Sequence, residues 1–202
     1  MAGDTRTWGI CGGSGAGKTY LVNQVVRQAR HDVAVVPFDA YYHDLADLTR
    51  DERAAMNFDH PDSLDVELFV LHLMQLAAGE PAEVPVYDFA NHTRTGETIT
   101  VEPAELVVTE GILLFSFPAV LAQLDLAIYL EAPAGVRLDR RVARDTVERG
   151  RFVGDVERQW AETVAPMHDQ FVAPHADNAD LTVPFGHERD VLLEDLFAQL
   201  VV

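Results

Sequence analysis

Residues 12–19 carry the strongest chemical signal in the sequence, because a glycine-rich run there ends in a lysine and a threonine. The run fits G-x-x-x-x-G-K-[ST] at every fixed position. Glycines let the backbone curl until several N–H groups point at the same oxygens, and a following helix presents its positive end to phosphate. We predict that this phosphate-binding loop (P-loop) holds a nucleoside triphosphate. The predicted contacts are Gly12, Gly13, Ser14, Gly15, Ala16, Gly17, Lys18, Thr19 and Tyr20.

Lys18 and Thr19 have different roles in this chemistry. The Lys18 ammonium can reach the β- and γ-phosphates, whereas the Thr19 hydroxyl is a ligand for Mg²⁺. Lys18 is the only lysine of the chain, which excludes the guanine-reading N-K-x-D motif of GTPases. The L-S-G-G-Q signature of transporter ATPases is also absent from the sequence. Among P-loop proteins, these absences leave a phosphotransferase that acts on a small-molecule acceptor.

Two carboxylates follow apolar segments that are typical of buried strands. Asp39 comes after residues 33–37, and Glu110 comes after residues 106–109. Open parallel sheets bind ligands at the carboxyl ends of their strands. We therefore predict that Glu110 holds Mg²⁺, directly or through water, and that Asp39 accepts the acceptor's proton or fixes the metal. The residues alone leave open that Asp39 forms a turn and that Glu110 is an exposed strand-end acid.

Apolar segments alternate with segments of helical spacing, as in βαβ units. This pattern predicts an α/β fold with a mostly parallel five-stranded sheet and helices on both faces. The predicted strands cover residues 7–11, 33–37, 106–109, 126–130 and 181–183. The predicted helices cover about residues 18–30, 65–78, 133–150, 155–167 and 188–200. The sequence contains no repeat and no linker, so residues 1–202 are expected to form a single domain.

Two segments are additions to this alternating pattern. Residues 84–101 alternate and contain a Thr-Gly turn, which predicts an inserted β-hairpin. Six of the 14 arginines fall between residues 137 and 151, which predicts an arginine-rich lid over about residues 134–158. We expect Arg137 and Arg140 to face solvent beside nearby acids, and the later arginines to close over phosphate.

The composition excludes several classes of protein. Lys and Arg number 15 and Asp and Glu 33, giving a formal net charge of −18, which is unsuited to general nucleic-acid or anionic-membrane binding. A single cysteine fits a reducing compartment, and residues 111–121, the longest apolar stretch, are too short to span a bilayer. The first residues lack a signal-peptide pattern, so a cytoplasmic location is expected.

The sequence resembles the uridine kinase (uridine–cytidine kinase) family of P-loop nucleoside kinases along nearly its whole length. The N-F-D-H-P-D and V-Y-D-F-x-x-H-[ST]-R strings, at residues 57–62 and 86–94, are specific to that family. The resemblance also includes the P-loop, D-A-Y-Y at 39–42, E-G-I-L at 110–113, and the arginine motifs at 140–145 and 148–151. It implies transfer of the ATP γ-phosphoryl group to the 5′-hydroxyl of uridine or cytidine, in pyrimidine salvage.

The resemblance also implies roles for individual residues. Asp39 matches the catalytic base, and Arg144 and Arg149 match lid arginines that face the phosphates. Positions that match the nucleoside site are Tyr42, Asp59, Tyr87, Phe89, His92, Arg141, Arg151 and Gln159. Among these, the hairpin residues and Arg151 match the pyrimidine contacts, and Asp59, Arg141 and Gln159 match the ribose contacts. Members of the family are commonly homotetramers, so the resemblance implies a homo-oligomer.

Two other functions remain as alternatives. A phosphoribulokinase-like enzyme shares the fold and the P-loop, but a sugar phosphate needs a second phosphate site rather than an aromatic hairpin. A non-catalytic nucleotide-binding regulator would need neither Asp39 nor Asp59, and both are present.

Overall fold

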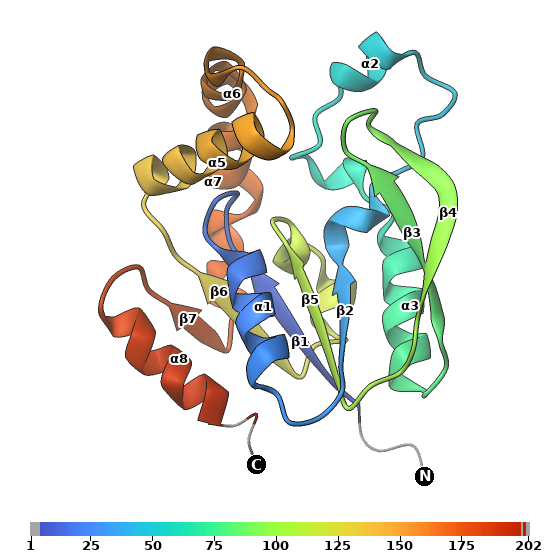
Figure 1. The fold of residues 1–202 in the computed structure, drawn as a ribbon, viewed down its shortest axis with the longest axis vertical. Coiled ribbons are helices and arrows are strands. Elements are labelled where there is room, and N and C mark those ends of the chain that lie inside the picture. The colour runs from blue at the N-terminus through green and yellow to red at the C-terminus, as the bar shows by residue number, and fades with distance from the viewer. Residues whose placement is uncertain (1–4, 199, 201–202) are drawn as a thin grey trace.

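A computed structural model describes residues 5–198 and Leu200, and its centre is a parallel sheet of five strands (Figure 1). The strand order is β2-β5-β1-β6-β7, with every neighbouring pair parallel. The strands are β1 (Arg6–Cys11), β2 (Val33–Pro37), β5 (Leu106–Gly111), β6 (Leu126–Leu130) and β7 (Leu181–Val183). The predicted sheet is confirmed, since only the ends of two strands differ from the predicted ranges.

Helices cover both faces of the sheet because buried side chains of the central strands alternate in direction. Ile10 and Val108 pack with α1 (Lys18–Gln28) and α8 (Glu188–Ala198). Cys11 and Val107 belong to the core on the other face. That face is covered by α3 (Val66–Ala77) and α4 (Pro118–Leu121). Asp65 caps α3 by accepting a hydrogen bond from the Leu68 amide, at the predicted start of that helix.

The inserted hairpin consists of β3 (Ala82–Asp88) and β4 (Thr93–Val101), an antiparallel pair that does not join the main sheet. Its register shifts between Pro85 and Tyr87, so the strand is irregular where the proline cannot donate. Figure 1 shows the hairpin in green beside α3, with its turn reaching toward the end of the molecule that carries α2 (Arg50–Ala54).

The arginine-rich segment that we predict to be a lid contains α5 (Ala134–Glu148) and α6 (Val153–Gln159). The helix predicted over 155–167 begins earlier and runs longer, through a π-helical turn (Trp160–Val164) into α7 (Ala165–Phe171). Pro166 has no N–H to donate to the preceding turn, and a π-helical turn at this point accommodates the break. α7 then leads through a 3₁₀ segment (Ala173–Asn178) to β7.

Short elements complete the molecule and were not among the predicted ones. α2 is closed by a capping box between Thr49 and Glu52, whose T-x-x-E spacing is readable in the sequence. Three-residue or four-residue 3₁₀ helices follow β2 (Phe38–Tyr41), precede α3 (Pro61–Ser63) and follow β5 (Leu114–Ser116). None of the helices that the structure describes combines the length and apolar character that crossing a bilayer requires.

Candidate active site

The P-loop leaves the carboxyl end of β1 and enters α1 directly. Gly17 is the N-cap of α1 with φ 104°, and Gly15 has φ 80°, a left-handed conformation that side chains rarely adopt. A Cβ on Gly15 would also collide with the carbonyl oxygen of Arg137. The loop therefore needs these glycines, and it directs the positive end of α1 toward the space above the sheet.

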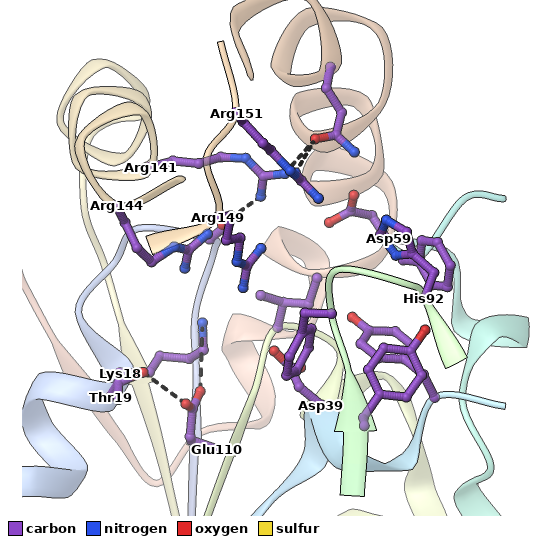
Figure 2. Close-up of a pocket in the computed structure, with 17 residues that line it drawn as sticks. Lys18, Thr19, Asp39, Asp59, His92, Glu110, Arg141, Arg144, Arg149 and Arg151 are labelled. Carbon is purple, nitrogen blue, oxygen red and sulfur yellow. Dashed lines mark hydrogen bonds and ion pairs between the residues drawn. The ribbon is translucent and has the colours of Figure 1, made fainter. Parts of the chain in front are cut away.

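One cavity above this end of the sheet is lined by parts of the chain that are far apart in sequence (Figure 2). The P-loop supplies one wall, and the end of β5 and the segment after β2 supply the floor. The hairpin, the arginine-rich helices and residues 58–59, which follow α2, supply the rest. Predicted site residues that line it are Ser14, Lys18, Thr19, Asp39, Tyr42, Asp59, Tyr87, Phe89, His92, Glu110, Arg141, Arg144, Arg149, Arg151 and Gln159.

The other predicted ATP contacts lie outside this cavity. Tyr20 is exposed and lines a neighbouring hollow with Gly17 and Phe185. Gly12, Gly13, Gly15 and Ala16 form the curve of the P-loop. Phe58 and Ile112 also line the cavity, and the prediction did not single them out although both lie within quoted motifs.

The phosphate end of the cavity holds Lys18, Thr19 and Glu110. The Thr19 hydroxyl donates a 2.9 Å hydrogen bond to Glu110, and the Lys18 ammonium lies 4.0 Å from the same carboxylate. Asp39 lines the same space, where burial, followed by the negative charge of Glu110, raises its pKa to about 6. At pH 7 Asp39 is thus mostly ionised yet close enough to neutrality to accept a proton.

The oxygens at this end fit a magnesium ion. The Thr19 hydroxyl and the carboxylates of Glu110 and Asp39 are hard oxygen donors, the type that Mg²⁺ prefers. Among the described residues, no group of three or more His, Cys, Asp or Glu side chains is placed to hold a metal by itself. That is consistent with an ion that enters with a triphosphate, because Mg²⁺ typically uses one or two carboxylates and completes its shell with phosphates and water.

The far end of the cavity holds a carboxylate, an arginine and an amide. Asp59 is 9% exposed, and burial raises its pKa. Arg141 donates 2.9 Å hydrogen bonds to the Ser14 hydroxyl and to Gln159, and Arg151 donates to the same amide oxygen at 3.0 Å. These groups can accept from and donate to vicinal hydroxyls, and the Arg141 bond to Ser14 connects this end to the P-loop.

Aromatic rings line the hairpin side of the cavity. Phe58 stacks on His92, with ring centroids 4.7 Å apart and planes at 15°. Tyr87 packs against Tyr42 and Phe89 at centroid distances of 5.3 and 5.1 Å. Burial, followed by the charges of nearby arginines, lowers the pKa of His92, so its ring is neutral at pH 7. A neutral histidine beside flat apolar walls can donate or accept toward a heterocyclic ring.

The lid arginines are organised by Asp145, which is fully buried. Its oxygens lie 2.8–3.7 Å from Arg141, Arg144, Arg149 and Arg151. This buried carboxylate holds four cations that line the cavity, and its single negative charge cannot neutralise all of them. Helical spacing alone could not predict that four arginines share one acid, because the chain turns back at Gly150, which has a φ of 63°, and so brings Arg151 to the same carboxylate.

The expectation that Arg137 and Arg140 face solvent is wrong for Arg137. Its side chain is 5% exposed, its Nε donates to the Ala132 carbonyl, and its guanidinium lies over the Trp160 ring. Arg140 donates to the carbonyls of Gly15 and Ala16 instead of pairing with an acid. The first turn of α5 is held against the P-loop, and tertiary contact decides the burial of its arginines.

Comparisons with known proteins agree with this geometry. The model of the phosphoribulokinase / uridine kinase family matches residues 8–192. A uridine kinase from Halobacterium salinarum is 43% identical over 88% of this chain and 79% of its own length. A uridine kinase from Staphylococcus carnosus is 41% identical over 94% of this chain and 92% of its own.

The fold of this chain is also similar to that of a solved structure. A structure described as a possible uridine kinase from Bacillus stearothermophilus superposes with a TM-score of 0.65 over 90% of this chain and 89% of that one, at 21% identity. This likeness concerns the fold, whereas the family model and the relatives above 40% identity span nearly the whole sequence. The resemblance inferred from the motifs is therefore confirmed, and the chain belongs to the phosphoribulokinase / uridine kinase family.

Proposed function

We propose that this chain is an ATP-dependent uridine/cytidine kinase that converts these nucleosides to UMP and CMP in pyrimidine salvage. The observation that carries the proposal is the single cavity that contains Lys18, Thr19 and Asp39 at one end and Asp59 and His92 at the other. The names of the relatives above 40% identity support the same activity.

Each end of the cavity suits one part of the reaction. Asp39 takes the proton of the nucleoside 5′-hydroxyl. The 5′-oxygen bonds to the γ-phosphorus, and the bond between the γ-phosphorus and the β,γ-bridging oxygen breaks, which releases ADP. Lys18 and the P-loop amides hold the triphosphate, and Arg144 and Arg149 stabilise the charge that spreads over the transferring group. Arg149 also lies over the Phe89 ring, 5.3 Å from its centroid, so the lid and the hairpin meet above the acceptor.

The nucleoside lies across the far end in this proposal. Asp59, Arg141 and Gln159 bind the ribose hydroxyls, while Tyr42, Tyr87 and Phe89 pack against the pyrimidine. Neutral His92 bonds to the ring position that carries a carbonyl in uridine and an amine in cytidine, which its two tautomers allow. Arg151 lies beside it as a further base contact. Magnesium at Thr19, Glu110 and Asp39 would neutralise phosphate charge when bound.

The alternatives receive less support from the same cavity. A phosphoribulokinase-like acceptor carries its own phosphate, whereas the hairpin end of the cavity presents Phe58, Tyr87 and Phe89. A non-catalytic regulator would need no base, yet Asp39 has a pKa raised to about 6. An acceptor screen with Mg·ATP decides between them. Uridine and cytidine should be consumed, whereas consumption of only a sugar phosphate, or of no acceptor, would refute the proposal.

We also propose that the protein is a cytoplasmic homo-oligomer, in line with the family resemblance. Support comes from large apolar side chains that are more than half exposed, Leu71 and Met74 on α3 and Ile99 on β4. Light scattering coupled to size exclusion measures the assembly, and a monomer at micromolar concentration would contradict it.

A further inference from the structure

Arg137 is a buried cation that the proposed kinase reaction does not use. It lies in the first turn of α5 and is 5% exposed. Its Nε donates to the Ala132 carbonyl at 3.1 Å, but Nη1 has no hydrogen-bond partner among the described residues. None of the ion pairs within 4.0 Å among the described residues includes Arg137, and Asp169, whose negative charge partly offsets the burial that lowers the pKa of Arg137, forms no such pair with it. Burying an unpaired charge is costly, so a counter-ion is expected.

His168 presents a second unpartnered group beside it. The buried Nδ1 of His168 has no partner in the described residues, and a Cβ on Gly13 would collide with both Nη1 of Arg137 and this nitrogen. The two groups therefore meet beneath Gly13. Burial, followed by the charge of Arg137, lowers the pKa of His168 to about 4, so the neutral ring has one N–H to donate.

Both residues line a cavity of about 450 Å³ that is separate from the active site. It shares no lining residue with the cavity of Asp39 and Asp59. Its walls include residues of α7 and of the segment after it, which pack on the face of the sheet opposite α1 and α8. Much of the remaining lining of the cavity consists of apolar or small side chains, those of Leu130, Pro133, Ala173, Ala176, Pro184 and Phe185.

We propose that this cavity binds a small carboxylate with an apolar body, held by Arg137 and His168. The planar guanidinium matches a carboxylate in a forked arrangement, and the apolar walls suit a short alkyl chain or one ring. Glu131 is exposed and also lines the cavity, so its charge disfavours a doubly charged anion such as phosphate. The site goes beyond the proposed kinase function and does not depend on it.

A ligand bound in this cavity would lie next to the P-loop, because Arg137 contacts that loop. Arg137 touches Gly13 through its guanidinium and Gly15 through its carbonyl oxygen. A carboxylate on Arg137 would fix the first turn of the lid helix against the phosphate-binding loop. Binding to the folded state alone also raises the melting temperature by mass action.

The test is a titration of benzoate, with benzamide as the neutral isostere, into the full chain. A saturating non-hydrolysable ATP analogue keeps the carboxylate away from Lys18. We expect benzoate to bind in the millimolar range or tighter, to raise the melting temperature, and to bind at least about tenfold tighter than benzamide. Propionate and inorganic phosphate are the comparison arms, and phosphate should bind more weakly than propionate.

Two variants locate the binding. Arg137→Gln and His168→Phe should each weaken benzoate about tenfold, while Arg27→Gln, at an exposed arginine of α1, should leave it unchanged. His168→Phe keeps a ring of similar shape if Arg137→Gln fails to fold. Equal affinity for benzamide, tighter binding of phosphate, absence of benzoate binding, or unchanged affinity in a folded variant would overturn the proposal.

Discussion

The Nε of Arg94 donates a 2.9 Å hydrogen bond to the main-chain carbonyl of Tyr42. Its Nη2 also pairs with Asp65 at 3.1 Å. Arg94 belongs to β4, Tyr42 follows the segment that carries Asp39, and Asp65 caps α3. The Arg94 side chain therefore connects the hairpin to the segment that carries Asp39 and Tyr42. This connection holds the proposed pyrimidine contacts of the hairpin in place relative to Asp39, the proposed proton acceptor.

Arg94→Met should loosen this connection without touching a substrate. We expect kcat/KM for uridine to fall roughly 10- to 100-fold, because small misplacement of reacting groups is costly, while KM for ATP stays near the wild-type value. Arg30→Met, at an exposed arginine, is the matched control. Equal losses for both substrates would show that Arg94 supports the fold in general.

Asp39→Asn should separate catalysis from stability. The amide cannot take the proton, so we expect kcat to fall ~10²–10⁴-fold with ATP binding retained. The raised pKa means that the ionised carboxylate destabilises the ligand-free protein at pH 7. The variant should therefore be more stable by up to about 2 kcal/mol at pH 7, with a smaller gain as the pH falls toward 4. Chemical denaturation of both proteins, with exposed Asp47→Asn as control, measures this difference.

The pH profile gives a second test of Asp39. Because burial, followed by the charge of Glu110, raises its pKa to about 6, kcat/KM should rise with pH and level off above about 7. Initial rates from pH 5 to 8 would define this limb for the free enzyme. An apparent pKa near 4 would mean that another group, or Asp39 in a changed environment, controls the reaction.

Asp59 should give the enzyme its preference for ribose. Removing the 2′-hydroxyl leaves a buried acceptor unpaired, at a cost of ~1–3 kcal/mol, so 2′-deoxyuridine should show kcat/KM lower by roughly 5- to 150-fold. Asp59→Ala should lower the rate with uridine more than with 2′-deoxyuridine, bringing the ratio toward one. If the ratio of kcat/KM for uridine to kcat/KM for 2′-deoxyuridine is unchanged in the variant, groups other than Asp59 select the ribose.

Asp145→Asn should release the lid arginines. The amide keeps the shape but leaves four cations without their shared counter-charge, and breaking a buried ion pair typically costs about 3–5 kcal/mol. We expect a lower melting temperature and a large fall in kcat. Asp139→Asn, at an exposed carboxylate of the same helix, should leave both unchanged. Wild-type stability in the Asp145 variant would mean that the arginines are held by other contacts.

The five parallel strands and the P-loop could be predicted because their signals are local. Residues 33–37 and 126–130 are short apolar runs between helical segments, and their observed bounds match the predicted ones. The glycines at 12–19 have backbone requirements that few other loops share. The bounds of the helix predicted over 155–167 are less readable from the sequence, because the π-helical turn before Pro166 has no clear periodic signal.

The chemistry of the phosphate-donor side can be inferred from the residues alone, because a loop that binds phosphate uses its own backbone and the helix that follows it. The burial of the charged groups, by contrast, follows from contacts that form only in the folded chain. Arg137 and Arg140 have the same spacing pattern as the other lid arginines, yet one is buried under Gly13 and the other bonds to P-loop carbonyls. The burial of Arg137 and the hydrogen bonds of Arg140 depend on contacts with the P-loop, which lies more than 100 residues away in the sequence, and periodicity within one helix cannot encode such contacts.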